Sequence, residues 1–380
     1  MAARDLEPRA TLRPRSLARA SLTPSARWLT LCAVAVVTAL TAAAAAQSAP
    51  QPRLKTPSLD AIGHASGAIP DRIITTPTRV LALAPGGYWG GPYKVASGET
   101  VTVYASNSYA MDPALGQRWA NFLASLVHGP ELSTVTVLLS TADQIGRVCG
   151  GDALACYSPH GALLYAPGDD PTADLSAEAV ITHEYGHHIA ANRSNSPWDA
   201  EDWGPKRWAS AEQVCARTKG GQLSPGAEDP VRYVVNPGEG WAETYRLLNQ
   251  RKLGVPESPW EIVSQSLYPT DAALAAADQD VTTPWLADAT SVRSGSVTRR
   301  SRTRTYTVST PLDGSLKVSL RSSAGLRVAL YVYASTTRVV HAAGAGSLTR
   351  STTVCGARTY RVRVTELHGA GSFRLTVAKP

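Results

Sequence analysis

The chain has 380 residues, of which 43% are hydrophobic, and this is enough for two modest cores. Its formal charge of +7 is concentrated at the N-terminus, because residues 1–46 hold six arginines and only two acidic residues. The rest of the chain has 31 basic and 28 acidic residues and no compact basic patch with interleaved aromatic residues. Composition and charge therefore exclude nucleic acid as a partner, and the arginines within residues 299–304 are interpreted as a solvated linker.

Residues 28–46 form an uncharged, alanine-rich run that follows an arginine-bearing segment. Small residues continue to Ala49 and offer an A-x-A-like cleavage site, so residues 1–49 are predicted to be a secretory signal peptide. An uncleaved membrane anchor is the alternative, because the run is nearly long enough to span a bilayer. Alanine is only weakly hydrophobic, which favours cleavage and a secreted, extracellular protein with no stable membrane association afterwards.

Residues 50–75 are rich in proline, serine and threonine and show no clear periodicity. They are predicted to be a linker or a short pro-segment. The sequence leaves open whether such a pro-segment inhibits the protein before its removal.

Four cysteines follow the leader, and an even number in an exported chain predicts two disulfides. Cys149 and Cys156 would close a short loop and are the local choice. Cys215 and Cys355 would then join the two halves of the protein. Four cysteines allow three pairings, and the other two remain open.

Residues 76–290 are predicted to form an α+β domain, because helical and alternating hydrophobic patterns follow one another. The patterns predict, in order, strands from residue 79 and over 98–106, a helix over 112–128, strands over 131–140 and 162–166, and helices over 176–192, 207–219 and 236–252.

The helix predicted over residues 176–192 contains His183-Glu184-x-x-His187, the HExxH pattern of zinc-dependent hydrolases. Positions four residues apart share one face of a helix, so the two imidazoles can bind one ion. Glu184 can then lie beside an activated water molecule and take its proton. Apolar residues repeat every four positions on the other face, and Gly186 predicts close approach by another segment.

Zinc in a hydrolase needs a third protein ligand and an open position. The metzincin ending of the motif is excluded, because Ala190 and Arg193 stand where it requires glycine and histidine. Glu239, which lies 52 residues after His187, is in the first turn of a predicted helix, and Glu243 follows one turn later. In such a pair one carboxylate can bind the metal while the other accepts a hydrogen bond from a ligand histidine.

These residues and the segment Glu239-Gly-Trp-Ala-Glu243 resemble the gluzincins, a group of zinc peptidases. The resemblance implies a zincin-like domain with a mixed sheet and active-site helices. It also implies one Zn²⁺ per chain, bound by His183, His187 and Glu239, with Glu184 as general base and acid and Glu243 supporting His183. The segment departs from the N-E-x-x-S-D pattern of the group, so Glu243 remains the alternative ligand. By the same resemblance, residues 162–166 would be an edge strand that pairs with extended substrate.

A peptidase of this group also needs a donor for the oxyanion of its tetrahedral intermediate. Tyr233, six residues before Glu239, is our candidate. His160 and Tyr245 are the alternatives.

Residues 295–380 consist of short alternating runs separated by glycine, serine and proline, and this pattern predicts a small β-sandwich. The segment weakly resembles the pre-peptidase C-terminal domains of secreted bacterial peptidases. Such a module could bind polymer surfaces, assist secretion or stabilise the protein.

The predicted function is that of a secreted, monomeric zinc-dependent endopeptidase acting on protein or peptide substrates, with an exopeptidase or a self-processing enzyme as variants. The alternative is a non-catalytic secreted binding protein. In that case the β-sandwich binds a surface or polymer, and the zincin-like domain is only a scaffold.

Overall fold

The computed structural model describes residues 71–74, 86–151 and 153–380. The signal peptide predicted over residues 1–49 lies outside the described residues, as does the predicted linker except for residues 71–74. None of the described helices combines the length and apolar character that a membrane span requires.

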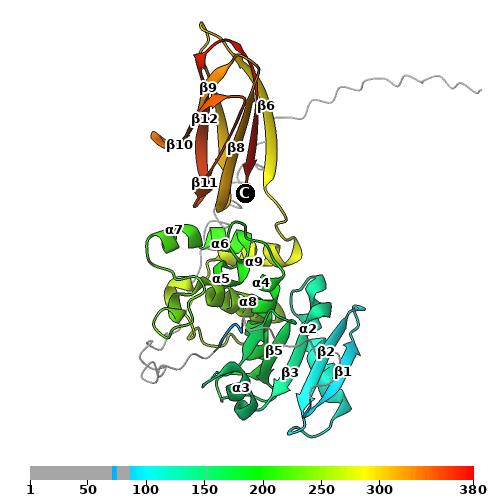
Figure 1. The fold of residues 1–380 in the computed structure, drawn as a ribbon. Coiled ribbons are helices and arrows are strands. Elements are labelled where there is room, and N and C mark those ends of the chain that lie inside the picture. The colour runs from blue at the N-terminus through cyan, green and yellow to red at the C-terminus, as the bar shows by residue number, and fades with distance from the viewer. Residues whose placement is uncertain (1–70, 75–85, 152) are drawn as a thin grey trace, which may run out of the picture. The chain divides into compact units, whose positions relative to one another are not determined.

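A five-stranded mixed sheet lies in the N-terminal half, with strand order β1-β2-β3-β5-β4 (Figure 1). β1 and β2 pair antiparallel, β3 runs parallel to both β2 and β5, and β4 pairs antiparallel with β5 at the edge. The bounds are β1 (Tyr88–Lys94), β2 (Thr100–Ser106), β3 (Thr136–Ser140), β4 (Cys156–Ser158) and β5 (Leu163–Pro167). The strand predicted over residues 162–166 is therefore internal, and the edge strand is the three-residue β4.

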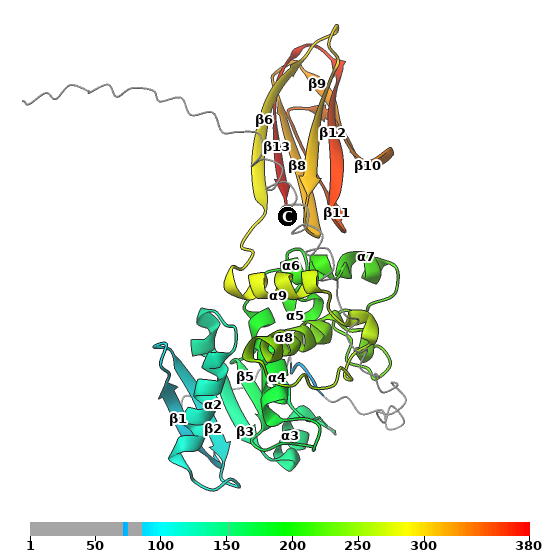
Figure 2. The ribbon, with the colours of Figure 1, turned by 180° about the vertical axis from the view of Figure 1, so that it is seen from behind.

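Helices cover both faces of this sheet (Figures 1 and 2). On β3, Val137 and Leu139 face the main core with helices α2 and α4, while Leu138 faces a smaller cluster with α3. The helices are α2 (Pro113–Ser125), α3 (Ala142–Cys149), α4 (Ala177–Ala191), α5 (Ala200–Trp203), α6 (Lys206–Ala211), α7 (Val214–Lys219), α8 (Pro237–Leu253) and α9 (Asp271–Thr282), with short 3₁₀ turns η3 (Pro130–Thr134), η4 (Tyr233–Val235) and η5 (Gln265–Leu267).

The strand predicted from residue 79 begins outside the described residues. Two other predicted elements differ in extent from the structure. Only the second half of the strand expected over residues 131–140 is extended, as β3. The first half belongs to a 3₁₀ turn, whose first position is occupied by Pro130, a place that proline favours. The single helix expected over residues 207–219 is two helices, α6 and α7. Gln213 between them has φ of 56°, a left-handed backbone that an α-helix interior does not tolerate.

Gly186 of α4 allows helices α4 and α8 to pack closely together. A Cβ at this position would lie 2.9 Å from the Cα of Ala242 in α8. The indole nitrogen of Trp241 donates a hydrogen bond of 2.7 Å to the Gly186 carbonyl. The close approach predicted from this glycine is confirmed, and it brings the polar residues of α4 and α8 together.

The C-terminal part consists of two four-stranded antiparallel sheets, which together resemble a β-sandwich. Apolar and polar residues alternate along these strands, and the apolar ones form the core. In β8, for example, Leu316, Val318 and Leu320 are buried between more exposed neighbours. One sheet has the order β10 (Thr337–Ala345), β9 (Arg327–Ala334), β12 (Arg358–His368), β7 (Thr303–Thr310), and the other β11 (Ser347–Val354), β8 (Gly314–Ser322), β13 (Gly371–Lys379), β6 (Ala289–Val297).

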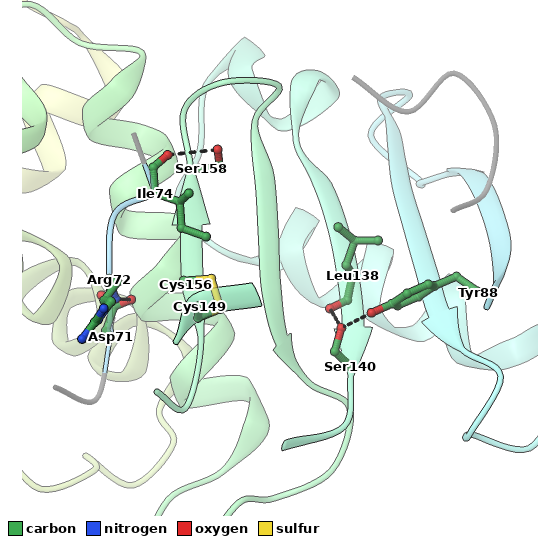
Figure 3. Close-up of a disulfide and its surroundings, with 9 residues drawn as sticks. All are labelled: Asp71, Arg72, Ile74, Tyr88, Leu138, Ser140, Cys149, Cys156 and Ser158. Carbon is green, nitrogen blue, oxygen red and sulfur yellow. Dashed lines mark hydrogen bonds between the residues drawn. A yellow bond between two sulfur atoms is a disulfide. The ribbon is translucent and has the colours of Figure 1, made fainter. Parts of the chain in front are cut away.

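The described residues contain two disulfides, and these join the pairs that the local choice predicts. Cys149 at the end of α3 is bonded to Cys156 of β4 (Figure 3), and Cys215 of α7 is bonded to Cys355 after β11. The first bond fixes the short edge strand to the adjacent helix.

Candidate metal centre

Helix α4 carries the HExxH residues and begins where the sequence predicts. The Ser176 side chain caps it by accepting a hydrogen bond from the Ala179 N–H. Ile181, Tyr185 and Ile189 enter the hydrophobic core, as their four-residue spacing predicts. His183 and His187 are on the other face, which is also buried, because α8 and residues 71–74 cover it.

Four side chains form a compact group of nitrogen and oxygen donors: Asp71, His183, His187 and Glu239, each no more than 2% exposed. The two histidine Nε2 atoms are 3.3 Å apart, and each lies 3.4 Å from Glu239 Oε2. Asp71 Oδ2 lies 3.2 Å from the first Nε2 and 2.9 Å from the second.

These separations test whether a metal fits. Donors at about 2.0–2.1 Å from a zinc ion, at the corners of a tetrahedron, are about 3.3 Å apart. The distances of 2.9–3.4 Å from the histidine nitrogens to each other and to the two carboxylates match this spacing. Two imidazole nitrogens and two carboxylate oxygens also suit zinc, although other divalent transition metals accept such ligands. The residues present therefore fit a bound divalent metal ion.

Glu239 lies in the first turn of α8. The Asn236 side chain caps this helix, and Pro237 occupies its first position. Tyr233 donates a hydrogen bond of 3.0 Å to Glu239 Oε2, the oxygen that faces the imidazoles. The other oxygen, Oε1, is buried without a hydrogen-bond partner among the described residues. A buried carboxylate oxygen without a hydrogen-bond partner is costly, and a bound cation would remove this cost.

Glu243 lies one helical turn further along, on the opposite side of His183 from the donor group. Its Oε1 is 2.9 Å from His183 Nδ1, and Arg246 binds the same carboxylate. Burial opposes ionisation, but Arg246 and His183 lower the pKa of Glu243 to about 2. The ionised carboxylate holds the proton of His183 on Nδ1, which leaves Nε2 free to bind a metal.

Glu184 is buried next to this group, and its Oε2 has no hydrogen-bond partner among the described residues. Burial raises the pKa of its carboxyl group well above the usual value, and the charge of Asp71 adds to the rise. A carboxyl group with a raised pKa beside a metal-capable group is a candidate for taking and returning a proton.

The carboxylates of the donor group favour positive charge on its imidazoles. Burial opposes protonation of His187, yet the charges of Glu239 and Asp71 raise its pKa to about 10. For Asp71 itself, burial is outweighed by hydrogen bonds with the two histidines, and its pKa is lowered. The potential that favours imidazolium also attracts a divalent cation, whose charge the two carboxylates would balance.

The two alternative oxyanion donors, Tyr245 and His160, do not contact the donor group through any described hydrogen bond, whereas Tyr233 does. The Tyr245 hydroxyl donates to the carbonyl of Val127, away from the donor group. His160 is exposed in the turn before β5. Tyr233 is the one of the three whose hydroxyl contacts a member of the group.

Sequence reasoning missed Asp71. It stands alone in a segment without periodicity and is 112 residues from His183, so no spacing rule connects the two. Two further acids near the site were also missed. Burial raises the pKa of both Glu201 and Glu228 to about 7, and the Glu228 carboxylate accepts a hydrogen bond from the Ile73 backbone.

Comparison with known proteins leaves the family open. No protein-family model matches the sequence, and no curated protein matches it significantly. Among solved structures, the pre-peptidase C-terminal domain of a Bacillus anthracis collagenase matches the C-terminal sheets at 16% identity and a TM-score of 0.21, covering 23% of this chain and 87% of that domain. A mitogen from Yersinia pseudotuberculosis matches at 8% identity and a TM-score of 0.20, covering 24% and 87%. PliG, a periplasmic inhibitor of g-type lysozyme from Aeromonas hydrophila, matches at 14% identity and 0.19, covering 24% and 86%. At these TM-scores the likenesses carry no argument about function.

Proposed function

We propose that the protein is a secreted, monomeric zinc-dependent endopeptidase that acts on protein or peptide substrates. The observation that carries the proposal is the convergence of His183 Nε2, His187 Nε2 and Glu239 Oε2 at separations of 3.3–3.4 Å, with the Glu184 carboxyl group beside them. The two disulfides fit an oxidising, extracellular environment.

In this proposal His183, His187 and Glu239 hold the ion, which when bound activates a water molecule and polarises the scissile carbonyl. Glu184 takes a proton on its carboxylate and returns it to the leaving amine. Glu243 and Arg246 orient the His183 ring. The Tyr233 hydroxyl, now bonded to Glu239, is the candidate donor to the developing oxyanion.

The test uses the purified full chain and an unfolded protein as substrate. Hydrolysis is expected, 1,10-phenanthroline should abolish it, and Glu184→Gln should lose it while retaining one zinc per chain. Glu178→Gln, an exposed glutamate on the same helix, is the matched control and should behave as wild type. Mass spectrometry of the products distinguishes internal cleavage from removal of terminal residues.

One observation favours a second candidate function. Four protein donors around one position are typical of structural zinc sites, whereas hydrolases keep an open position. In that case the protein is a non-catalytic binding protein, and the C-terminal sheets bind a surface or polymer. Bound zinc with no turnover by the wild type, and none by a variant that lacks the Asp71 carboxylate, would favour this reading.

A further inference from the structure

Residues 71–74, here called the strap, form a short extended segment along the free edge of β4 (Figure 3). Ile73 pairs in parallel with Tyr157, whose N–H donates to the Arg72 carbonyl and whose carbonyl accepts from the Ile74 N–H at 2.8 Å. The Ser158 hydroxyl donates to the Ile74 carbonyl. The strap is thus an added strand on an edge that is itself fixed by the Cys149–Cys156 disulfide.

At the start of the strap, the Asp71 side chain turns into the candidate metal centre. Its Oδ2 lies 2.9 Å from His187 Nε2 and 3.2 Å from His183 Nε2, distances similar to those between the other donors. Three protein ligands leave a fourth tetrahedral position for water or substrate, and a fourth protein ligand removes it. Asp71 is the donor that closes this group.

The environment of Asp71 supports this role. The residue is 2% exposed, although it belongs to a segment whose other three residues are only partly buried. Its Oδ2 lies against the two histidines of the donor group, while the Arg72 backbone N–H donates to its Oδ1. A buried ionised carboxylate depends on a positive partner. Glu184, the candidate general base, also lies against it. The carboxylate therefore stands where the reacting groups would meet.

We propose that the strap is an autoinhibitory segment, in which Asp71 is the fourth ligand of the metal and release of the strap opens the site. This inference rests on the proposed peptidase function. Release would also free the Tyr157 N–H and carbonyl at the edge of β4, with which an extended peptide can pair as an added strand. In the closed state the strap would therefore occupy both the fourth ligand position of the metal and the edge of β4, and a substrate peptide needs both.

The test uses the full chain loaded with Co²⁺, whose visible spectrum reports its ligands, and acetohydroxamate as a small metal-binding probe. The variants are Asp71→Asn and Asp71→Ala, which weaken or remove the ligand, and Ile74→Pro, which keeps the carboxylate but removes the N–H donor to Tyr157. Asp174→Asn, an exposed aspartate before α4, is the matched control. Turnover of an unfolded protein by the zinc-loaded forms is measured in parallel.

We expect the Asp71 variants to keep the metal, change the Co²⁺ spectrum and bind acetohydroxamate at least about tenfold more tightly than wild type, because the open state is no longer a minor population. Ile74→Pro should shift binding in the same direction, and Asp174→Asn should match wild type. Turnover should rise by a similar factor in the variants that open the site.

The outcomes separate the two proposals. Unchanged spectra and probe binding in both Asp71 variants would overturn the strap, whether or not the wild type hydrolyses peptides. Loss of the metal from both variants would also overturn it, because Asp71 would then be a structural ligand. Open access without turnover in any form would uphold the strap as the closing element and contradict the peptidase function.

Discussion

Glu243 Oε1 lies 2.9 Å from His183 Nδ1, on the side of the ring away from the donor group. The carboxylate is held in turn by Arg246. Because the same helix supplies Glu239 one turn earlier, α8 provides both a candidate ligand and the group that orients another. The i, i+4 spacing of two acids on one helix thus has a direct structural consequence.

Replacement of Glu243 by glutamine is expected to weaken zinc binding by about 10–100-fold, because the partner that fixes the His183 ring is lost. Competition with a chromophoric chelator measures this affinity. Since the change leaves Arg246 buried without its ion pair, the double variant Glu243→Gln/Arg246→Met serves to separate metal loss from misfolding. Wild-type affinity in a folded double variant would contradict the role given to Glu243.

Tyr233→Phe is expected to lower kcat by about 10²–10³-fold with little change in KM, because it removes the candidate donor to the oxyanion. Steady-state kinetics on a peptide substrate measure the effect. Tyr245→Phe is the matched control, since that hydroxyl donates to Val127 and should leave kcat unchanged. If zinc affinity falls in Tyr233→Phe while kcat at saturating zinc is unaffected, the hydroxyl only supports Glu239.

Gly186→Ala is expected to lower the free energy of unfolding by about 1–3 kcal/mol, because the new methyl group would meet the Ala242 backbone where α4 and α8 are in closest contact. The gain in helix propensity, about 1 kcal/mol, offsets part of this loss. Urea unfolding provides the measurement. Gly91→Ala, at a glycine with open space around it, is the control, and equal stability of the two variants would contradict the close packing.

Loss of the Cys149–Cys156 bond in a double serine variant is expected to cost about 2 kcal/mol, since the bond closes a short loop in the unfolded chain. Thermal unfolding with and without the bond tests this. Val148→Ser, an exposed neighbour, controls for the local change in polarity. A double variant as stable as wild type would show that the hydrogen bonds of β4 with β5 and with residues 71–74 hold it without the disulfide.

Where the sequence carried a local signal, the prediction and the structure agree. The sequence patterns predicted α4 and α8 closely, and in the structure Ser176, Asn236 and Pro237 each satisfy the start of a helix. Gly186 predicted close packing because only a glycine leaves room there. The acid pair on α8 predicted two distinct positions for its carboxylates, and the structure has Glu239 in the donor group and Glu243 behind His183.

Where position depends on contacts distant in sequence, the prediction failed or was silent. Asp71 has no neighbouring pattern, and only the pairing of the strap with β4 brings it to the histidines. β4 itself is three residues long, too short for its alternation to be recognised. The edge position expected for residues 162–166 followed from the resemblance alone, and it is wrong because β4 lies beyond β5. The break at Gln213 depends on a left-handed backbone that its residue type does not announce.

X-ray absorption at the zinc edge of the purified full chain, together with its metal content, tests the central claim most directly. We predict one zinc per chain, bound by two imidazole nitrogens and two oxygens at about 2.0–2.1 Å, and loss of this site in Glu239→Gln. Purified chain without bound metal would contradict the account. So would a spectrum that shows no imidazole ligands and that does not change in Glu239→Gln.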